Sequence, residues 1–168
     1  MGNETLEEIY EAYAKEVSRY LFSISLDYEI TEELVQETFF RAFLQIEKLR
    51  SEQIKPWLFK VAYNLFIDKK RKDKRLIHKD IDFYDVANNS LTIEEQMLMK
   101  ERLQSILINI RELPEKQKNA LLLVSIHHFT YEQTAQVMGI SESNVKILIF
   151  RARQTLRNNE RGNGNGNG

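Results

Sequence analysis

The sequence predicts an all-α protein with two small helical domains joined by a flexible linker, the C-terminal one a helix-turn-helix. Three observations predict this class. Apolar residues recur at helical spacing in the first part of the chain, a central stretch has no sustained period, and a helix, glycine turn, helix pattern lies near the end. We place a first domain at 1–77, a linker at 78–92, a second domain at 93–158 and a disordered Gly/Asn tail at 159–168.

Composition limits the class of protein. The chain contains no cysteine, so neither disulfides nor thiolate metal sites are indicated. The longest apolar run, residues 120–124, is far shorter than the ~20 residues of a membrane helix. The acidic start lacks the basic residues and the apolar run of a signal peptide. We therefore expect a soluble, cytoplasmic protein.

Charge is distributed in blocks, although the formal net charge is only -1. Residues 1–40 hold ten acidic against two basic residues, whereas 41–79 hold twelve basic against four acidic ones. Residues 80–112 are acidic again, and the remainder is basic. Such blocks imply more than one kind of surface. A basic face for nucleic acid and an acidic face for a protein would fit them.

The first two helices should each bury one stripe. The stripe of the first consists of Leu6, Ile9, Tyr10, Tyr13, Val17, Tyr20, Leu21 and Ile24. Thr31 is predicted to cap the second helix, with Glu32 and Glu33 in its first turn, where the helix dipole favours negative charge. Its inward stripe should be Leu34 or Val35, Thr38, Phe39, Ala42, Phe43 and Ile46.

The other side of the second helix has two interpretations. It carries Glu33, Gln36, Glu37, Phe40, Arg41 and Leu44. Phe40 and Leu44 form either a second core face, which is the default for large apolar residues, or a docking surface with an aromatic anchor inside a charged rim.

The third helix is predicted to start at Pro56, because proline suits the first helical position, after a loop at residues 50–55. Its apolar stripe is Leu58, Val61, Ala62 and Leu65, and a different face carries Trp57, Lys60, Asn64, Asp68 and Arg71. Trp57 either packs in the core or stacks on an unpaired base. The helix runs into six basic residues within positions 69–75, which form either a solvated face or a phosphate footprint.

The second domain begins with two further helices, one at 93–110 that ends at the Leu113-Pro114 pair and one at 115–126. His127 and His128 follow, and on a helix they would point about 100° apart and could not share a metal ion. Neither has an evident nucleophile or acid partner, and there is no glycine-rich phosphate loop. We predict binding rather than catalysis, with no catalytic residue, no metal, no cofactor and no small-molecule substrate.

The stretch 130–157 carries the most specific signal. Thr130 and Gln133 form a capping box at the start of one helix, Gly139 can take the left-handed conformation that ends it, and Ser141 can cap the next. The second helix should pack on the first and reach phosphates at its end. The residues expected to do so are Val145, Leu148, Ile149 and Ala152 for packing, and Arg151, Arg153 and Arg157 for phosphates. An ordinary helix pair in a bundle is the alternative.

Three stretches, in the right order, resemble the extracytoplasmic-function (ECF) sigma factors of bacterial RNA polymerase. They are TEELVQETFFRAF, PWLFKVAYNLFIDKKRKDKR, and LPEKQKNALLLV followed by FTYEQTAQVMGISESNVKILIFRARQTLR. The resemblance covers most of residues 6–157. It implies a helical region 2, a flexible linker and a helical region 4 in a dissociable subunit that directs polymerase to promoters.

The resemblance also implies three sets of site residues. Docking on the clamp helices of the beta-prime subunit falls to Glu33, Gln36, Glu37 and Phe40, which favours an exposed Phe40. Recognition and melting of the minus-10 element fall to Ser51, Glu52, Gln53, Ile54, Lys55, Trp57, Asn64, Asp68, Lys69 and Arg71. In relatives the segment that matches residues 51–55 captures a flipped base. Minus-35 recognition falls to Ser141, Glu142, Ser143, Asn144, Lys146, Arg151 and Arg153.

The sequence departs from the family in the helix-turn-helix. Many relatives carry Gly-Thr in place of Ser143-Asn144 and a Ser-Arg pair in place of Ile147-Leu148, so an arginine that could contact DNA is missing. The expected partners are core RNA polymerase, through the beta-prime clamp helices and the beta flap, promoter DNA, and an anti-sigma factor, which is often membrane-bound in the family. Two alternatives stand beside this function: a helix-turn-helix regulator that binds duplex DNA without polymerase, and a sigma-like inhibitor that occupies the polymerase clamp.

Overall fold

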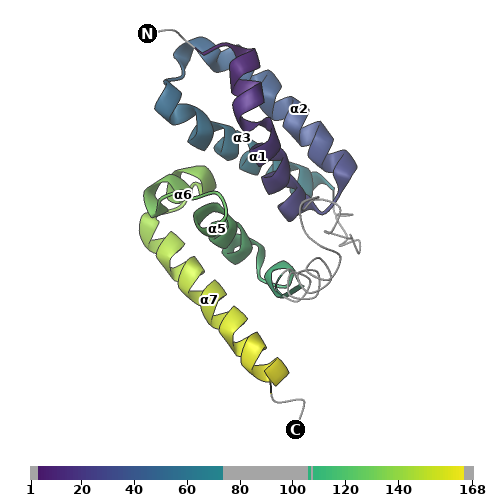
Figure 1. The fold of residues 1–168 in the computed structure, drawn as a ribbon, viewed down its shortest axis with the longest axis vertical. Helices are drawn as coiled ribbons and strands as arrows, with labels where there is room; N and C mark the ends of the chain where they lie inside the picture. Colours follow the sequence, from purple (N-terminus) through teal and green to yellow (C-terminus); the bar gives the residue numbers. More distant parts are fainter. Residues whose placement is uncertain (1–3, 74–105, 107, 165–168) are drawn as a thin grey trace, which may run out of the picture.

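The computed structural model describes residues 4–73, 106 and 108–164, and the regular structure within these ranges is helical. The N-terminal half contains α1 (Leu6–Ser25), α2 (Tyr28–Gln45), a short 3-10 helix (Ile46–Lys48) and α3 (Ser51–Lys72). The C-terminal half contains α5 (Glu115–Ser125), α6 (Tyr131–Met138) and α7 (Glu142–Gly164). Figure 1 shows α5 and α6 between the N-terminal helices and α7. The predicted all-α class is confirmed.

The helices α1, α2 and α3 pack around an apolar core. A capping box starts α1: the Thr5 hydroxyl accepts the N–H of Glu8 at 3.2 Å, and the Glu8 carboxylate accepts the N–H of Thr5 at 2.8 Å. Val17, Leu21 and Leu58 have no exposed surface. Burying one such side chain contributes about 1.5–3 kcal/mol. The packing of these buried side chains, rather than intrinsic helix propensity, therefore holds the helices together.

The helix-turn-helix forms as predicted. Thr130 closes the capping box with Gln133, and Gly139 ends α6 with a φ of 66°. The Ser141 hydroxyl accepts the N–H of Asn144 at 3.2 Å at the start of α7. The inward residues of α7 are Val145, Ile149 and Ala152, which are buried, and Leu148, which packs partly against the core.

The start of α2 differs from the prediction. The helix begins at Tyr28, because the Asp27 carboxylate accepts a backbone N–H of the first turn at 3.1 Å and so acts as the cap. Thr31 lies buried one turn inside the helix, where its hydroxyl donates to the Asp27 carbonyl at 2.7 Å. The acidic residue of the first turn is Glu29 rather than the predicted Glu32 and Glu33. Aspartate and threonine both cap helices, and capping at Asp27 gives a longer helix with more backbone hydrogen bonds than capping at Thr31 would.

Two further predictions about this half were wrong. Residues 51–55 are helical rather than a loop, so Pro56 lies inside α3, and it forgoes only the hydrogen bond that its missing N–H would make to the Glu52 carbonyl. Phe43 was predicted to face inward but is 56% exposed. Each residue turns the helix by about 100°, and this step carries Phe43 past the edge of the stripe that ends at Ala42.

Some predicted features fall outside the described residues. They include the linker at 78–92 and most of the helix at 93–110, of which 106 and 108–110 are described and helical. The helix α7 continues to Gly164 and so extends into the tail at 159–168 that is predicted to be disordered. Extending an existing helix needs no new nucleus, which offsets the poor propensity of glycine. None of the described helices has the length and apolar character to cross a membrane.

Candidate functional site

A groove between α2 and the end of α3 brings two predicted surfaces together. Residues predicted for polymerase docking and for minus-10 DNA both line it: Glu33, Gln36, Glu37, Phe40, Asp68 and Lys69. Lys69 Nζ lies 3.0 Å from Glu33 Oε2, and Arg41 Nε lies 3.2 Å from Glu37 Oε1. Because Glu33 is 63% exposed and Arg41 and Glu37 are 50% and 46% exposed, each pair is screened by water and contributes at most ~1 kcal/mol. Their charged groups can therefore exchange these partners for those of another molecule.

Phe40 is the apolar centre of this surface. Its side chain is 57% exposed and that of Leu44 is 60% exposed, so these residues do not form a second core face. Phe43 is similarly exposed but does not line the groove. An exposed aromatic ring inside a charged rim is typical of an anchor in a protein interface.

The outer face of α3 is polar and open to solvent. Asn64, Asp68 and Arg71 are exposed along it, and the last turn carries the cluster Lys69, Lys70, Arg71 and Lys72. Cations are favoured there because the helix dipole is negative at the C-terminus. Trp57 is only partly buried and packs against the core. Trp57 is therefore neither fully buried in the core nor fully exposed for stacking on a base.

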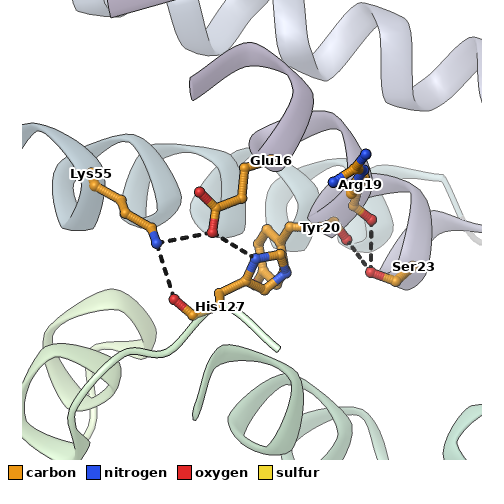
Figure 2. A network of polar contacts seen from close by, with 6 residues as sticks. All are labelled: Glu16, Arg19, Tyr20, Ser23, Lys55 and His127. Carbon is orange, nitrogen blue, oxygen red and sulfur yellow. Dashed lines mark hydrogen bonds and ion pairs between the residues drawn. The ribbon is translucent and has the colours of Figure 1, made fainter. Parts of the chain in front are cut away.

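The first turn of α3 divides into exposed and buried residues. Ser51, Glu52 and Gln53 are exposed, whereas Ile54 is 2% exposed and belongs to the core. Ile54 is thus not available at the surface in this conformation. Lys55 points toward the C-terminal half, where its Nζ lies 2.9 Å from Glu16 Oε1 and donates to the His127 carbonyl at 3.0 Å (Figure 2).

His127 lies at the centre of the contact between the two halves, which we call the seam (Glu16, Tyr20, Lys55, Asn119 and His127). Its ring is 3% exposed, lies edge-on to Tyr20, and places Nδ1 3.2 Å from Glu16 Oε1. Burial lowers the pKa of His127 by more than the hydrogen bond and charge of Glu16 raise it. The imidazole is therefore neutral at pH 7, and its Nδ1–H donates to the carboxylate.

The carboxylate of Glu16 is held in its charged form. Burial raises the pKa of Glu16, but the hydrogen bonds and charges of Lys55 and His127 outweigh that effect and lower the pKa overall. The Lys55 ammonium also faces the Phe129 ring at 5.1 Å from its centroid. Both partners of this ion pair are therefore partly shielded from water, whereas Glu33 of the α2–α3 groove is 63% exposed.

Two more contacts join the halves. The Tyr20 hydroxyl donates to Asn119 Oδ1 at 2.7 Å, and both side chains are 0% exposed. Burial raises the pKa of Tyr20 well above its usual value, so the phenol keeps its proton and remains a donor. Lys70 pairs with Glu115 at the start of α5. Lys55 and Lys70, both from the basic block of the N-terminal half, are thus engaged by the C-terminal half.

The helix α7 presents a polar face away from its core. All residues predicted for minus-35 DNA are exposed: Ser141, Glu142, Ser143, Asn144, Lys146, Arg151 and Arg153. Glu142 Oε1 lies 3.9 Å from Lys146 Nζ, a weak pair of exposed side chains. The packing of α7 on α6 leaves this face open, as a helix that enters a DNA groove requires.

The predictions about metal and catalytic residues concern the two adjacent histidines, His127 and His128. No group of three or more His, Cys, Asp or Glu side chains that could hold a metal ion occurs in the part of the chain that the structure describes. The prediction that neither histidine has an acid partner was wrong for His127, whose partner Glu16 lies 111 positions away in the sequence. Nor do the histidines lie on a helix, because they follow the end of α5 and His128 has a φ of 60°. The buried position of His127 in the seam gives it a structural role.

Comparison with known proteins identifies the family. The model of Sigma-70 region 2 matches residues 9–76, and that of Sigma-70, region 4 matches residues 109–156. The ECF RNA polymerase sigma factor SigM of Bacillus subtilis (strain 168) is 38% identical over 155 residues, which cover 91% of this chain and 93% of SigM. The chain belongs to the ECF RNA polymerase sigma factors. It is thus an alternative sigma factor, which directs promoter-specific transcription initiation.

Other relatives and solved structures agree with this assignment. The ECF RNA polymerase sigma factor SigX of Bacillus subtilis (strain 168) is 28% identical, over 92% of this sigma factor and 82% of SigX. The sigma factor RpoE from Bartonella quintana, solved in complex with the anti-sigma factor NepR, superposes with a TM-score of 0.74 at 20% identity and covers 92% of this chain and 96% of its own. CnrH, solved in complex with the cytosolic domain of CnrY, superposes with a TM-score of 0.63 at 18% identity, over 90% of this chain and 84% of its own. These two structures show the same fold.

The seam is the part of the sigma factor that sequence reasoning missed. Glu16 lies outside the buried stripe predicted for the first helix, and Lys55 is predicted to lie in a loop that contacts DNA. One signal could have raised the question: His127 is an ionisable residue placed directly after the apolar run at 120–124. A polar residue in such a position is often buried with a hydrogen-bond partner, but the partner itself cannot be read from spacing.

Proposed function

We propose that this sigma factor binds core RNA polymerase through the α2–α3 groove and contacts two promoter elements, the minus-10 element through α3 and the minus-35 element through α7. One observation carries the proposal: the groove joins an exposed aromatic anchor to the basic end of α3, while α7 exposes a separate basic face. Nucleotide addition remains with the core enzyme, in the cytoplasm.

The docking surface consists of Glu33, Gln36, Glu37 and Phe40. The exposed Phe40 ring would enter an apolar pocket of the beta-prime clamp helices, and the surrounding carboxylates and amide would fix its orientation. Region 4 would contact the beta flap. The exposed pairs of Glu33 and Glu37 support this proposal, because breaking them costs little.

Minus-10 recognition requires the N-terminal basic block to face DNA. Asn64, Asp68, Lys69 and Arg71 lie along α3 for this purpose, and the exposed Ser51, Glu52 and Gln53 are candidates for holding a flipped base, with Ile54 supporting them from the core. Trp57 keeps enough exposed surface to stack on a base. Lys55 and Lys70 would join them after release from Glu16 and Glu115.

A second protein partner is expected to control this sigma factor. The related structures contain RpoE bound to the anti-sigma factor NepR and CnrH bound to the cytosolic domain of CnrY. By analogy we propose that an anti-sigma factor, which is often anchored in the membrane in this family, binds the present chain and blocks its polymerase surface.

Transcription by reconstituted polymerase tests the proposal. The purified protein is added to sigma-free core polymerase with a promoter library, and start sites are mapped. We expect start sites that share two spaced elements, and no transcription from any promoter would overturn the proposal. A regulator independent of polymerase would instead form a dimer on a palindromic site without core enzyme.

Charge reversal separates the proposed activator from a clamp-binding inhibitor. Arg71→Glu should strongly weaken promoter opening but leave polymerase binding, since Arg71 is assigned to DNA and does not line the α2–α3 groove. The control is Lys48→Glu, an exposed site in the 3-10 helix, outside the α2–α3 groove and the basic end of α3. An inhibitor would keep its activity in both variants.

A further inference from the structure

Two apolar side chains of α7 are exposed and are not among its predicted DNA residues: Ile147 at 46% and Phe150 at 63%. Val145 and Ile149 are 0% and 2% exposed and define the side of α7 that faces the core. Ile147 is two residues from each, which on a helix places it on the opposite side. It is 46% exposed, and unlike Leu148 it does not pack against the core.

The surroundings of Ile147 favour DNA over a protein as its partner. Two exposed cations lie close to Ile147 in the helix, Lys146 one residue before it and Arg151 four residues after it, and the acid Glu142 lies 3.9 Å from Lys146. An apolar strip bordered by cations suits a DNA groove, where phosphates flank the base edges. A protein partner would need acidic groups around its apolar pocket to complement these cations, whereas DNA supplies its phosphates along the whole groove.

We propose that Ile147 recognises a thymine in the upstream promoter element by contact with its C5-methyl group. Thymine alone carries a methyl group on the major-groove edge, so an aliphatic side chain there distinguishes it from the other bases. The inference rests on the proposed function, because it requires α7 to lie in the major groove of that element. It makes Ile147 a specificity residue at the position where many relatives carry a polar serine.

Replacement of thymine by deoxyuridine tests this contact, because it removes the methyl group and nothing else. Holoenzyme is reconstituted with the full chain, its upstream element is mapped, and each thymine of that element is replaced singly. Burial of one methyl group predicts that the wild type loses about fourfold in promoter affinity at one position. The Ile147→Ala variant should bind the unmodified promoter several-fold more weakly and be insensitive to deoxyuridine at that position.

The control is Ile126→Ala, which truncates another isoleucine, 58% exposed, at the end of α5. This variant should keep the affinity and the deoxyuridine sensitivity of the wild type. The inference is overturned if no thymine is sensitive, if Ile147→Ala keeps the full sensitivity, or if Ile147→Ala weakens only the binding of core polymerase. Failure of the wild-type protein to direct any transcription would overturn the proposed function as well, so the two failures are distinguishable.

Discussion

The seam between the two halves can be tested by removing a single oxygen atom. Tyr20→Phe deletes the hydroxyl that donates to Asn119 Oδ1 at 2.7 Å and leaves the rest of the ring in place. Both side chains are 0% exposed, so water cannot replace the lost donor. The amide oxygen of Asn119 then stays buried without this hydrogen bond.

The cost of Tyr20→Phe follows from that buried acceptor. An unsatisfied buried polar group costs about 1–3 kcal/mol, whereas the net value of an ordinary hydrogen bond is nearer 1 kcal/mol. We expect the free energy of unfolding in urea at pH 7 to fall within this range of about 1–3 kcal/mol. Because the bond joins the two halves, its loss should also increase the hydrodynamic radius in native buffer if the halves separate before either of them unfolds.

The matched control is Tyr28→Phe, at a tyrosine that is 58% exposed and stacks on Phe22. Its hydroxyl is not needed for the stacking, so we expect a change within about 0.5 kcal/mol. If Tyr20→Phe changes the unfolding free energy and the radius no more than this control does, the buried seam is not a feature of the protein in solution.

Three other predictions concern docking, pH and helix capping. Phe40→Ala should weaken core-polymerase binding at least tenfold in a pull-down titration, as loss of a central anchor does, while Phe43→Ala changes it little; equal effects would contradict the docking surface. The pKa of His127 is lowered from 6.5 and that of Glu16 from 4.5, so the unfolded chain takes up a proton at each group before the folded one does. The free energy of unfolding should therefore be highest above pH 6.5 and should fall as the pH drops below 6.5 and again below 4.5. A free energy of unfolding in urea that stays constant between about pH 7 and 5 would contradict this. Thr130→Ala should lower the unfolding free energy by about 0.5–2 kcal/mol in the same assay, and no loss would exclude a stabilising capping box.

The helices whose ends are set locally could be predicted from the sequence. At α6 a capping box and a glycine act within a few residues of each other, so Thr130, Gln133 and Gly139 fix both ends. At α2 both Asp27 and Thr31 could cap the helix, and the structure uses Asp27. Which residue marks the start depends on how much helix the core can stabilise, and that is not a local property. The start predicted at Pro56 was wrong for the same reason, since α3 begins upstream, where Ile54 packs in the core.

Within the candidate site, too, features set by local pattern could be predicted and contacts between distant segments could not. Exposure of Phe40 and of the polar face of α7 follows from helical periodicity once the buried stripe is known. The partners of Lys55 do not follow, because Glu16 and His127 come from α1 and from the turn after α5. Pairing across such distances in the chain depends on how two packed units meet, and no local pattern encodes it.

Lys55 and Lys70, the two lysines that contact the C-terminal half, differ in the free energy needed to break their contacts. The pair of Lys70 with Glu115 is partly exposed, so opening it costs at most ~1 kcal/mol and a phosphate can take the place of the carboxylate. Lys55 holds both the Glu16 carboxylate and the His127 carbonyl, and its departure leaves a partly buried charge beside a neutral imidazole. Under the proposed function, then, Lys70 can reach DNA while the halves remain in contact, whereas Lys55 reaches it only when they part.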